Sequence, residues 1–370
     1  MSYFLYFTFA AVLGTLITPL IKRAAVKTGT LDIPSSARKI HKQPVPLLGG
    51  LALFLSLVLS LLLYLQFGRP DFNIVPLKFF LAIIYGGLVL MVGGALDDKY
   101  NLPPKILWLF PAVASLIVVW SGIGVGITQL SNPFGGPIRI AHDFQFLIFN
   151  FQLSAVLMWF WMMGMIFTTK FLDGLDGLCS GIGLIGSLTM FALSLTAKVN
   201  QPITATLAII FAGALLGYLF YAFNPASIFL GETGSTFIGF MLGVLSIISG
   251  AKIATALLVM GIPILDVAWV IVRRLYYRTS PFRADRQHLH FRLMDIGLSH
   301  RQTVLALYAI SALFGFTAVF LQSFGKLIAL ILLICVMLVT AISVVMLYKK
   351  QHPHIPDLFE SVKPPVDQNR

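Results

Sequence analysis

The chain has 370 residues, of which 58% are hydrophobic and only 11% are charged, whereas a soluble domain carries roughly 25% charged residues. This composition cannot be arranged around a water-facing surface, so it excludes an ordinary soluble protein and indicates an all-α, multi-pass membrane protein. The formal net charge of +12 could suit nucleic acid, but the positive residues gather at membrane boundaries instead. Cys179 and Cys335 lie in apolar runs and show neither disulfide nor metal spacing.

Apolar runs of about 20 residues predict transmembrane helices. The first run has neither a charged leading region nor a cleavage site, so we expect it to be retained as a span. We interpret 1–350 as a single transmembrane catalytic domain and 351–370 as a polar cytoplasmic tail. About eleven spans are predicted, at 3–21, 47–67, 79–95, 106–121, 153–169, 178–197, 203–223, 234–251, 253–272, 303–321 and 327–348.

The positive residues predict how the bundle is oriented. Twenty of the 26 Lys and Arg residues fall on one set of connecting segments and six on the other. Because cytoplasmic loops carry the excess, the N-terminus is expected outside the cell membrane and the C-terminus in the cytoplasm. Nearly all acidic residues at membrane boundaries also lie on the cytoplasmic side, so we expect the functional site there. The outer stretch 122–152 predicts a short hairpin or an amphipathic cover.

Five carboxylates stand out on the cytoplasmic side. Asp97 and Asp98 end the third predicted span, and adjacent carboxylates stay ionised only with cations nearby, which fits a divalent metal, a base beside it, or a solvated helix end. Asp173 and Asp176 are three residues apart between glycines, and helix capping explains one of them but not both. Glu232 follows Gly231 at a helix start, where a phosphate or a capping role both fit.

Two basic segments accompany the carboxylates. The loop 273–302 holds seven arginines with His288 and His290, whose spacing of two does not match a helical zinc pair. An anionic substrate suits this loop, although positive-inside anchoring explains most of its arginines. A second cluster holds Arg38, Lys39, His41 and Lys42, and could bind a lipid phosphate or face anionic headgroups.

Asp266 lies inside the ninth predicted span. An intramembrane carboxylate indicates function by default, and a buried ion pair with Arg273 is the equally weighted alternative. Carboxylates, basic side chains and a bilayer together suggest phosphoryl transfer from a Mg²⁺-bound nucleotide diphosphate to a phosphate anchored in the membrane.

Six segments, in order, carry a resemblance to a known family over nearly the whole chain: RKIHKQPVPLLGG, LDDKYNLPPK, FLDGLDGL, FNPASIFLGETGS, PILD and SPFRADRQHLHFRLMDIGLSHRQ. Together they resemble the polyprenyl-phosphate N-acetylhexosamine-1-phosphate transferases of glycosyltransferase family 4. The resemblance implies transfer of a sugar 1-phosphate from a UDP-sugar to undecaprenyl or another polyprenyl phosphate, with release of UMP, as the first membrane step of a cell-envelope glycan pathway. It also implies Mg²⁺ or Mn²⁺ as cofactor and a homodimer as the common assembly.

The resemblance also implies roles for individual residues. Asp97 matches the base that activates the lipid phosphate, and Asp98, Asp173 and Glu232 are the implied metal ligands. The implied catalytic set is Asp97, Asp98, Asp173, Asp176, His288 and His290. The implied substrate-binding set, in which Phe229 matches a position that stacks on uracil, is Arg38, Lys39, His41, Lys105, Lys170, Asn224, Phe229, Arg286 and Arg292.

The sequence departs from the family pattern at five positions. The family usually has Asn where this chain has Lys170 and Phe167, Asp at Glu232, His at Phe291, and often Asn at Ala222. Lys170 and Phe291 keep one alternative open, a catalytically inactive relative that binds nucleotide or lipid. Carboxylates at membrane depth and glycine-interrupted helices keep another open, a secondary transporter.

Overall fold

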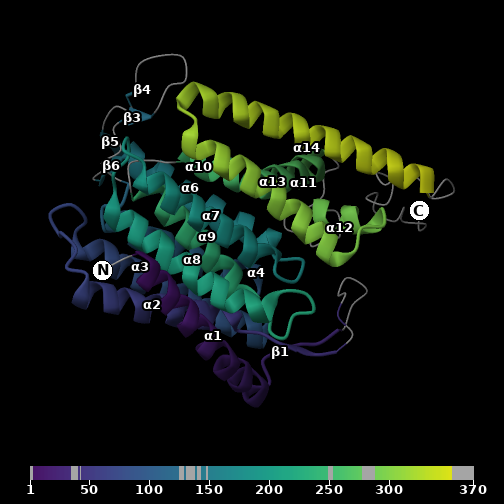
Figure 1. Ribbon diagram of the computed structural model, residues 1–370, viewed down its shortest axis with the longest axis horizontal. Coiled ribbons are helices and arrows are strands. Elements are labelled where there is room, and N and C mark those ends of the chain that lie inside the picture. The colour runs from purple at the N-terminus through teal and green to yellow at the C-terminus, as the bar shows by residue number, and fades with distance from the viewer. Residues whose placement is uncertain are drawn as a thin grey trace.

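Helices dominate the computed structural model, which describes residues 3–34, 41, 43–124, 129–130, 138–139, 143–146, 149–248, 253–276 and 288–351. Figure 1 shows them packed side by side, with the start of the first helix and the end of the last helix at opposite ends of the bundle. The helices are α1 (Tyr3–Thr28), α2 (Gly49–Phe67), α3 (Leu77–Tyr100), α4 (Pro104–Leu107), α5 (Leu109–Trp120), α6 (Leu153–Leu172), α7 (Leu178–Leu195), α8 (Pro202–Ala222), α9 (Gly231–Ile247), α10 (Ile253–Val259), α11 (Gly261–Tyr276), α12 (Leu289–Asp295), α13 (His300–Phe320) and α14 (Ser323–Gln351).

The helices confirm an all-α membrane protein. Within the described residues, eight helices are long and apolar enough to cross a membrane, namely α1, α2, α3, α6, α7, α8, α13 and α14. The predicted spans 106–121 and 234–251 coincide with the shorter helices α5 and α9, and the span 253–272 coincides with α10 and α11. The number eleven therefore stays a prediction.

The ninth predicted span is not one straight helix. Its two halves, α10 and α11, meet at a bend of 80°. Gly261 and Pro263 open the second half, and a proline lacks the backbone N–H that would continue the hydrogen-bond ladder of the first half. Because of this break, α11 runs in a different direction from α10.

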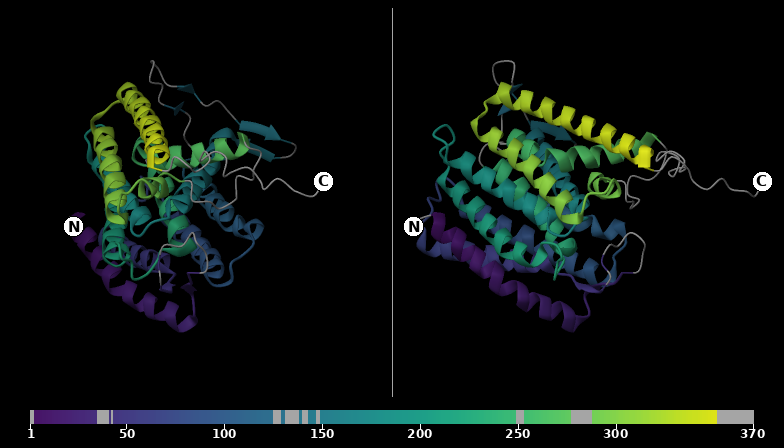
Figure 2. Two further views of the ribbon diagram at one scale, coloured as in Figure 1. Left: turned by 90° about the vertical axis from the view of Figure 1, so that its right-hand side faces the viewer. Right: turned by 45° about the vertical axis from the view of Figure 1, so that its right-hand side comes forward.

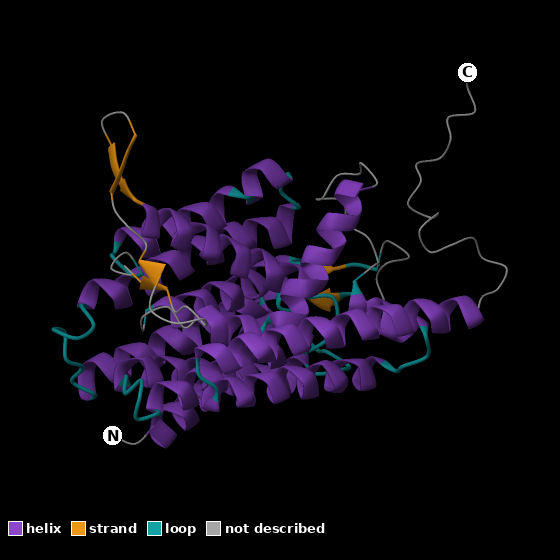
Figure 3. Cartoon of the chain, turned by 90° about the horizontal axis from the view of Figure 1, so that it is seen from above, coloured by secondary structure: helices purple, strands orange, loops and turns teal. Residues whose placement is uncertain are grey.

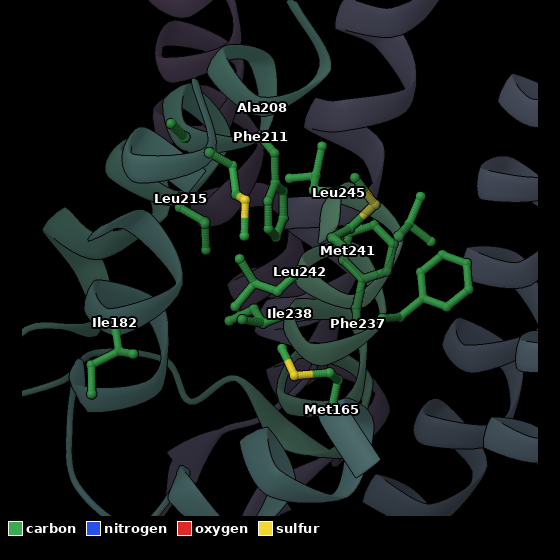
Figure 4. Close-up of a cluster of buried hydrophobic side chains, with 14 of the residues drawn as sticks. Met165, Ile182, Ala208, Phe211, Leu215, Phe237, Ile238, Met241, Leu242 and Leu245 are labelled. Carbon is green, nitrogen blue, oxygen red and sulfur yellow. The ribbon is translucent and has the colours of Figure 1, made fainter. Parts of the chain in front are cut away.

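The core is centred on α9, which is buried from Thr233 to Ile247. This helix packs against α2, α3, α6, α7 and α8. Figure 4 shows Phe237, Met241 and Leu245 of α9 among side chains of α6, α7 and α8. A helix that is apolar on all faces and enclosed by other helices is held in place by neighbours on every side, so its N-terminus has a fixed position.

Glycines let neighbouring helices approach the start of α9 closely. A Cβ on Gly50 of α2 would overlap the backbone of Gly234, and a Cβ on Gly94 of α3 would overlap the backbone of Thr233. Small residues are the usual means of close helix contact in membranes. Gly94 lies one helical turn before Asp98, so this contact brings that carboxylate to the first turn of α9.

Short antiparallel strand pairs flank the helices at both ends (Figure 3). The strands β1 (Leu31–Asp32) and β2 (Val45–Pro46) pair between α1 and α2. The stretch predicted as a hairpin or cover contains two pairs, β3 (Gln129–Leu130) with β4 (Ile138–Arg139) and β5 (Asp143–Phe146) with β6 (Phe149–Gln152). In Figure 1, β1 and α12 lie at the end away from the N-terminus, and β3 to β6 lie at the N-terminal end.

The last two helices lie on the outside of the bundle, as Figure 2 shows for α13 and the yellow α14. Helix α14 contacts α10, α11 and α13. Only 17% of its most apolar window is buried within the protein, whereas α8 is 83% buried. Such an apolar, uncovered surface is suited to lipid contact.

Candidate active site

Asp98 connects α3 to the N-terminus of α9. Its Oδ1 accepts a 2.7 Å hydrogen bond from the backbone N–H of Glu232, and its Oδ2 accepts a 3.3 Å bond from the hydroxyl of Thr233. The first backbone N–H groups of a helix have no partner within it, and they favour a negative charge. Asp98 therefore caps α9 from another helix.

Gly231 provides the space for this cap. Its φ of +69° is in the left-handed region, and a Cβ there would overlap the carboxylate of Asp98. Both properties favour glycine at this position. The neighbouring Asp97 turns toward the following loop, where its Oδ1 accepts a 2.9 Å bond from the N–H of Leu102.

The DGLDG segment forms the turn between α6 and α7. Asp173 follows the last residue of α6. Asp176 accepts hydrogen bonds on Oδ2 from the Asn224 side chain at 2.9 Å and from the Ala226 N–H at 3.0 Å. Arg301 of α13 donates two bonds, of 3.0 and 2.8 Å, to the carbonyl oxygen of Asn224. Asp176 therefore joins the turn to the segment that leads into α9.

The carboxylates lie close enough to perturb one another. Burial, and after it the negative charges of three neighbouring carboxylates, raises the pKa of Asp173 to about 8. These neighbours are Asp98, Asp176 and Glu232. Like charges that share a desolvated site disfavour ionisation, and a cation between them restores it. The cluster therefore has the chemistry of a cation site.

One cation of the protein already lies in this cluster. Lys170, in the last turn of α6, donates a 2.8 Å hydrogen bond from Nζ to Oε1 of Glu232 in the first turn of α9. The side chains are 26% and 10% exposed, respectively. Lys170 and Glu232 are both positions where this sequence departs from the family motifs. The two departures therefore contact each other.

The histidine segment is held by Asp266. Its Oδ2 lies 2.7 Å from Nδ1 of His288, and its Oδ1 accepts a 2.8 Å bond from the N–H of Leu289. The His288 ring lies parallel to the ring of His290, at 5.7 Å, and stacks on Phe171 at 6.0 Å. Asp266 therefore contacts the histidine segment of the predicted site.

His290 packs against the DGLDG turn. It is only 2% exposed, and its Nε2 touches the position where a Cβ on Gly174 would lie. Burial, more than any charge, lowers the pKa of His290 to about 3, so the ring is neutral at pH 7. This histidine fixes the loop against the turn, and its catalytic role stays a prediction.

His41 and Phe229 meet beside the start of α2. Their rings are in edge contact at 5.2 Å. The N–H of Phe229 donates a 2.8 Å bond to Pro46 of β2, and its carbonyl accepts a 3.0 Å bond from Gly49. His41 and β2 thus lie next to the segment that precedes Glu232.

Comparison with known proteins identifies the family. Residues 80–250 match the family model described as glycosyl transferase family 4. The chain is 32% identical to a Bacillus subtilis protein named a probable undecaprenyl-phosphate N-acetylglucosaminyl 1-phosphate transferase, over 83% of this chain and 82% of that protein. The chain belongs to glycosyl transferase family 4.

Two further relatives match over a similar length. A decaprenyl-phosphate N-acetylglucosaminephosphotransferase of Mycolicibacterium smegmatis is 31% identical over 84% of this chain and 79% of that protein. An undecaprenyl-phosphate alpha-N-acetylglucosaminyl 1-phosphate transferase of Thermotoga maritima is 29% identical over 89% of this chain and 94% of that protein. The resemblance predicted from the motifs is therefore confirmed.

The remaining predicted site residues fall into two groups. Lys105 is exposed in α4, after the turn that follows Asp97. Arg292 is half-buried in α12, two residues after His290. The predictions for Arg38, Lys39 and Arg286, and for the tail after residue 351, lie outside the described residues.

Two residues join the site without having been singled out from the sequence. Arg301 holds Asn224, as described above, and the hydroxyl of Tyr308 donates to the carbonyl oxygen of Gly177. Both belong to α13 and contact the DGLDG turn or its partner. Arg301 entered the sequence-based prediction only as one of the positive residues that set the orientation, although it lies in the last segment of the family resemblance. No motif or spacing in the sequence points to Tyr308.

Proposed function

We propose that this chain transfers an N-acetylhexosamine 1-phosphate, with GlcNAc as the expected sugar, from a UDP-sugar to a polyprenyl phosphate such as undecaprenyl phosphate, with release of UMP. The observation that supports it most strongly is the meeting of Asp98, Asp173, Asp176 and Glu232 at one end of the bundle, in a chain whose relatives carry the names of such transferases. Carboxylates at a bilayer boundary suit a reaction between a soluble diphosphate and a lipid phosphate.

In this reaction an oxygen of the lipid phosphate forms a bond to the phosphorus that carries the sugar, and the bond from that phosphorus to the bridging oxygen of UMP breaks. Asp97 accepts the proton of the lipid phosphate when that phosphate arrives protonated. Asp176, fixed by Asn224 and Ala226, holds the turn under the nucleotide. Phe229, half-buried beside His41, offers a ring face to the uracil.

The carboxylate oxygens fit Mg²⁺. No group of three or more His, Cys, Asp or Glu residues within the described ranges is arranged as a complete metal site. Mg²⁺ does not need one, because it is usually bound by one or two carboxylates together with substrate phosphates. Asp98 and Asp173 are the residues that would hold it. When bound, the ion would neutralise the charge that develops on the diphosphate.

The decisive experiment is UMP release by the purified full chain with undecaprenyl phosphate and Mg²⁺, across UDP-GlcNAc, UDP-GalNAc, a UDP-diacetamido sugar and UDP-MurNAc-pentapeptide. We expect release with UDP-GlcNAc, and its loss on addition of EDTA and in Asp173→Asn. Asp71→Asn, an exposed carboxylate at the opposite end, is the matched control. No release with any donor, by protein that still binds UDP-GlcNAc, would point to the inactive relative instead.

We also propose that the site faces the cytoplasm. In the sequence, the excess of Lys and Arg residues falls in the same set of connecting segments as the carboxylates Asp97, Asp98, Asp173 and Glu232. A UDP-sugar is a soluble cytoplasmic metabolite, so this orientation gives the donor direct access. The homodimer implied by the family stays a prediction.

A further inference from the structure

The Lys170–Glu232 ion pair lies within the carboxylate cluster. Lys170 lies in the last turn of α6, before the DGLDG turn, and Glu232 lies in the first turn of α9, beside the Asp98 cap. The charge of Lys170 also acts on Asp97. This single ammonium group thus faces carboxylates from α3 and from α9 at once.

The pair changes what each partner can do. Oε1 of Glu232 already accepts the ammonium at 2.8 Å, so a divalent cation on the same carboxylate would lie next to a fixed positive charge and be repelled by it. Lys170, in contrast, has three N–H donors, and its one hydrogen bond among the described residues uses a single donor. Its side chain is 26% exposed, so the remaining donors can reach a ligand.

We propose that Lys170 binds the diphosphate of the donor and that Glu232 is its positioning residue rather than a metal ligand. The proposal rests on the proposed function, because it assigns part of the same site. A lysine has a flexible four-carbon stem, and a carboxylate that fixes its end removes the entropy that binding would otherwise cost. Phosphate oxygens are the acceptors that an ammonium group in this place would recognise.

The test compares Lys170→Met, Glu232→Gln and the double variant, each in the full chain in detergent. The matched control is Lys99→Met, which removes an exposed positive charge from the last turn of α3, next to Asp98. Lys170→Arg keeps the charge and the ion pair, and remains informative should another variant fail to fold. Three quantities are measured: KM for UDP-GlcNAc, the Mg²⁺ concentration for half-maximal rate, and the thermal-midpoint shifts caused by Mg²⁺ alone and by UDP-GlcNAc alone.

We expect Lys170→Met to raise KM for UDP-GlcNAc by about 10-fold to 100-fold, as for the loss of one charge-assisted hydrogen bond. Glu232→Gln should raise it by a similar factor, and the double variant should be no worse than either single one. The Mg²⁺ requirement and the Mg²⁺-induced midpoint shift should stay unchanged in all three. Lys99→Met should remain close to the parent chain, whereas Lys170→Arg, which keeps the charge on a different head group, should fall between the parent and Lys170→Met.

The opposite pattern would overturn the proposal. If Glu232→Gln lost the Mg²⁺-induced shift while Lys170→Met kept its KM, Glu232 would be a metal ligand and Lys170 a bystander, although the proposed function would stand. If the parent chain released no UMP from any donor, the proposed function would fail. The shift caused by UDP-GlcNAc would then decide separately whether Lys170 binds the diphosphate, since it needs no turnover.

Discussion

At the scale of single residues, Asp98 has two tasks that are separable. Its carboxylate caps α9 through the N–H of Glu232 and the hydroxyl of Thr233, and its negative charge is part of the cluster around Asp173. A side-chain amide can still cap a helix, whereas a methyl group cannot. Substitutions can therefore remove the charge with or without the cap.

We expect Asp98→Asn to lower the rate of UMP release by about 100-fold or more, because the charge is lost from the cation site, while the thermal midpoint in detergent changes little. Asp98→Ala should lower the rate equally and also cost about 1 kcal/mol of stability, because the cap is lost. Equal midpoints for the two variants would show that the cap does not stabilise α9.

A second prediction at this scale concerns Gly231, for which Gly29 serves as a control. Gly231 and Gly29 have similar φ values of +69° and +71°, but only Gly231 faces the Asp98 carboxylate, while a Cβ on Gly29 would meet nothing within 4 Å. Gly29→Ala should therefore cost only the backbone penalty of about 1 kcal/mol. Gly231→Ala should cost more in a thermal melt and should also abolish UMP release, because Asp98 must move. Equal effects of the two substitutions would contradict the role of Gly231.

At the scale of elements, the bent pair α10 and α11 matters because α11 carries Asp266. This residue fixes both His288 and the first N–H of α12. Asp266 therefore links α11 to α12 beside the site. Its position depends on the break at Gly261 and Pro263.

We expect Asp266→Asn to keep the hydrogen bond from Leu289 but to lose the charge beside His288. The variant should fold with a nearly unchanged thermal midpoint and show a kcat reduced by about 10-fold, with KM for the donor unchanged. Asp266→Glu, which keeps the charge, should recover part of the rate. An effect on the midpoint without an effect on kcat would make Asp266 a purely structural residue.

Part of this arrangement could be predicted from the sequence. The motifs predicted that Asp97, Asp98, Asp173, Asp176 and Glu232 serve one site, and the spacing of apolar runs predicted the helices. The predicted span began at residue 234, with Gly231 and Glu232 expected at a helix start just before it, and α9 begins at Gly231. The residue that caps it, Asp98, is 134 residues away from Glu232 along the chain, so no local pattern around Gly231 could show which side chain caps the helix.

The Lys170–Glu232 contact was not predictable for a related reason. Each residue was recognised as a departure by itself, but the two are 62 residues apart. Only the packing of α6 against α9 brings them together. By contrast, the bend between α10 and α11 had a local signal, since a glycine and a proline interrupt that apolar run.

At the scale of the whole molecule, the candidate site lies at one end of the helix bundle, and none of the described residues assigned to it lies at the other end. The C-terminal ends of α3 and α6, which lead to the carboxylates, lie with α12 and β1 at the end away from the N-terminus (Figure 1). The segment between α2 and α3, with Asn73, lies at the other end. This polarity gives a direct test of orientation.

We expect Asn101→Cys, next to Asp97, to resist a membrane-impermeant maleimide in intact cells and to react after permeabilisation. Asn73→Cys should react in intact cells. Both substitutions are made in a chain with Cys179→Ala and Cys335→Ala, so that only the new thiol is labelled. The reverse labelling pattern would place the site outside the cell and exclude a cytoplasmic donor.

The ion pair between α6 and α9 also constrains how this sequence could have arisen. Changing either Lys170 or Glu232 alone leaves a partly buried charge without its partner, which is costly in a desolvated site. The two positions should therefore change together during evolution, so that lineages with a lysine at the first position also have a glutamate at the second. An ancestor that carried neither would have had to pass through a weakened intermediate, or acquire both substitutions before selection acted against one.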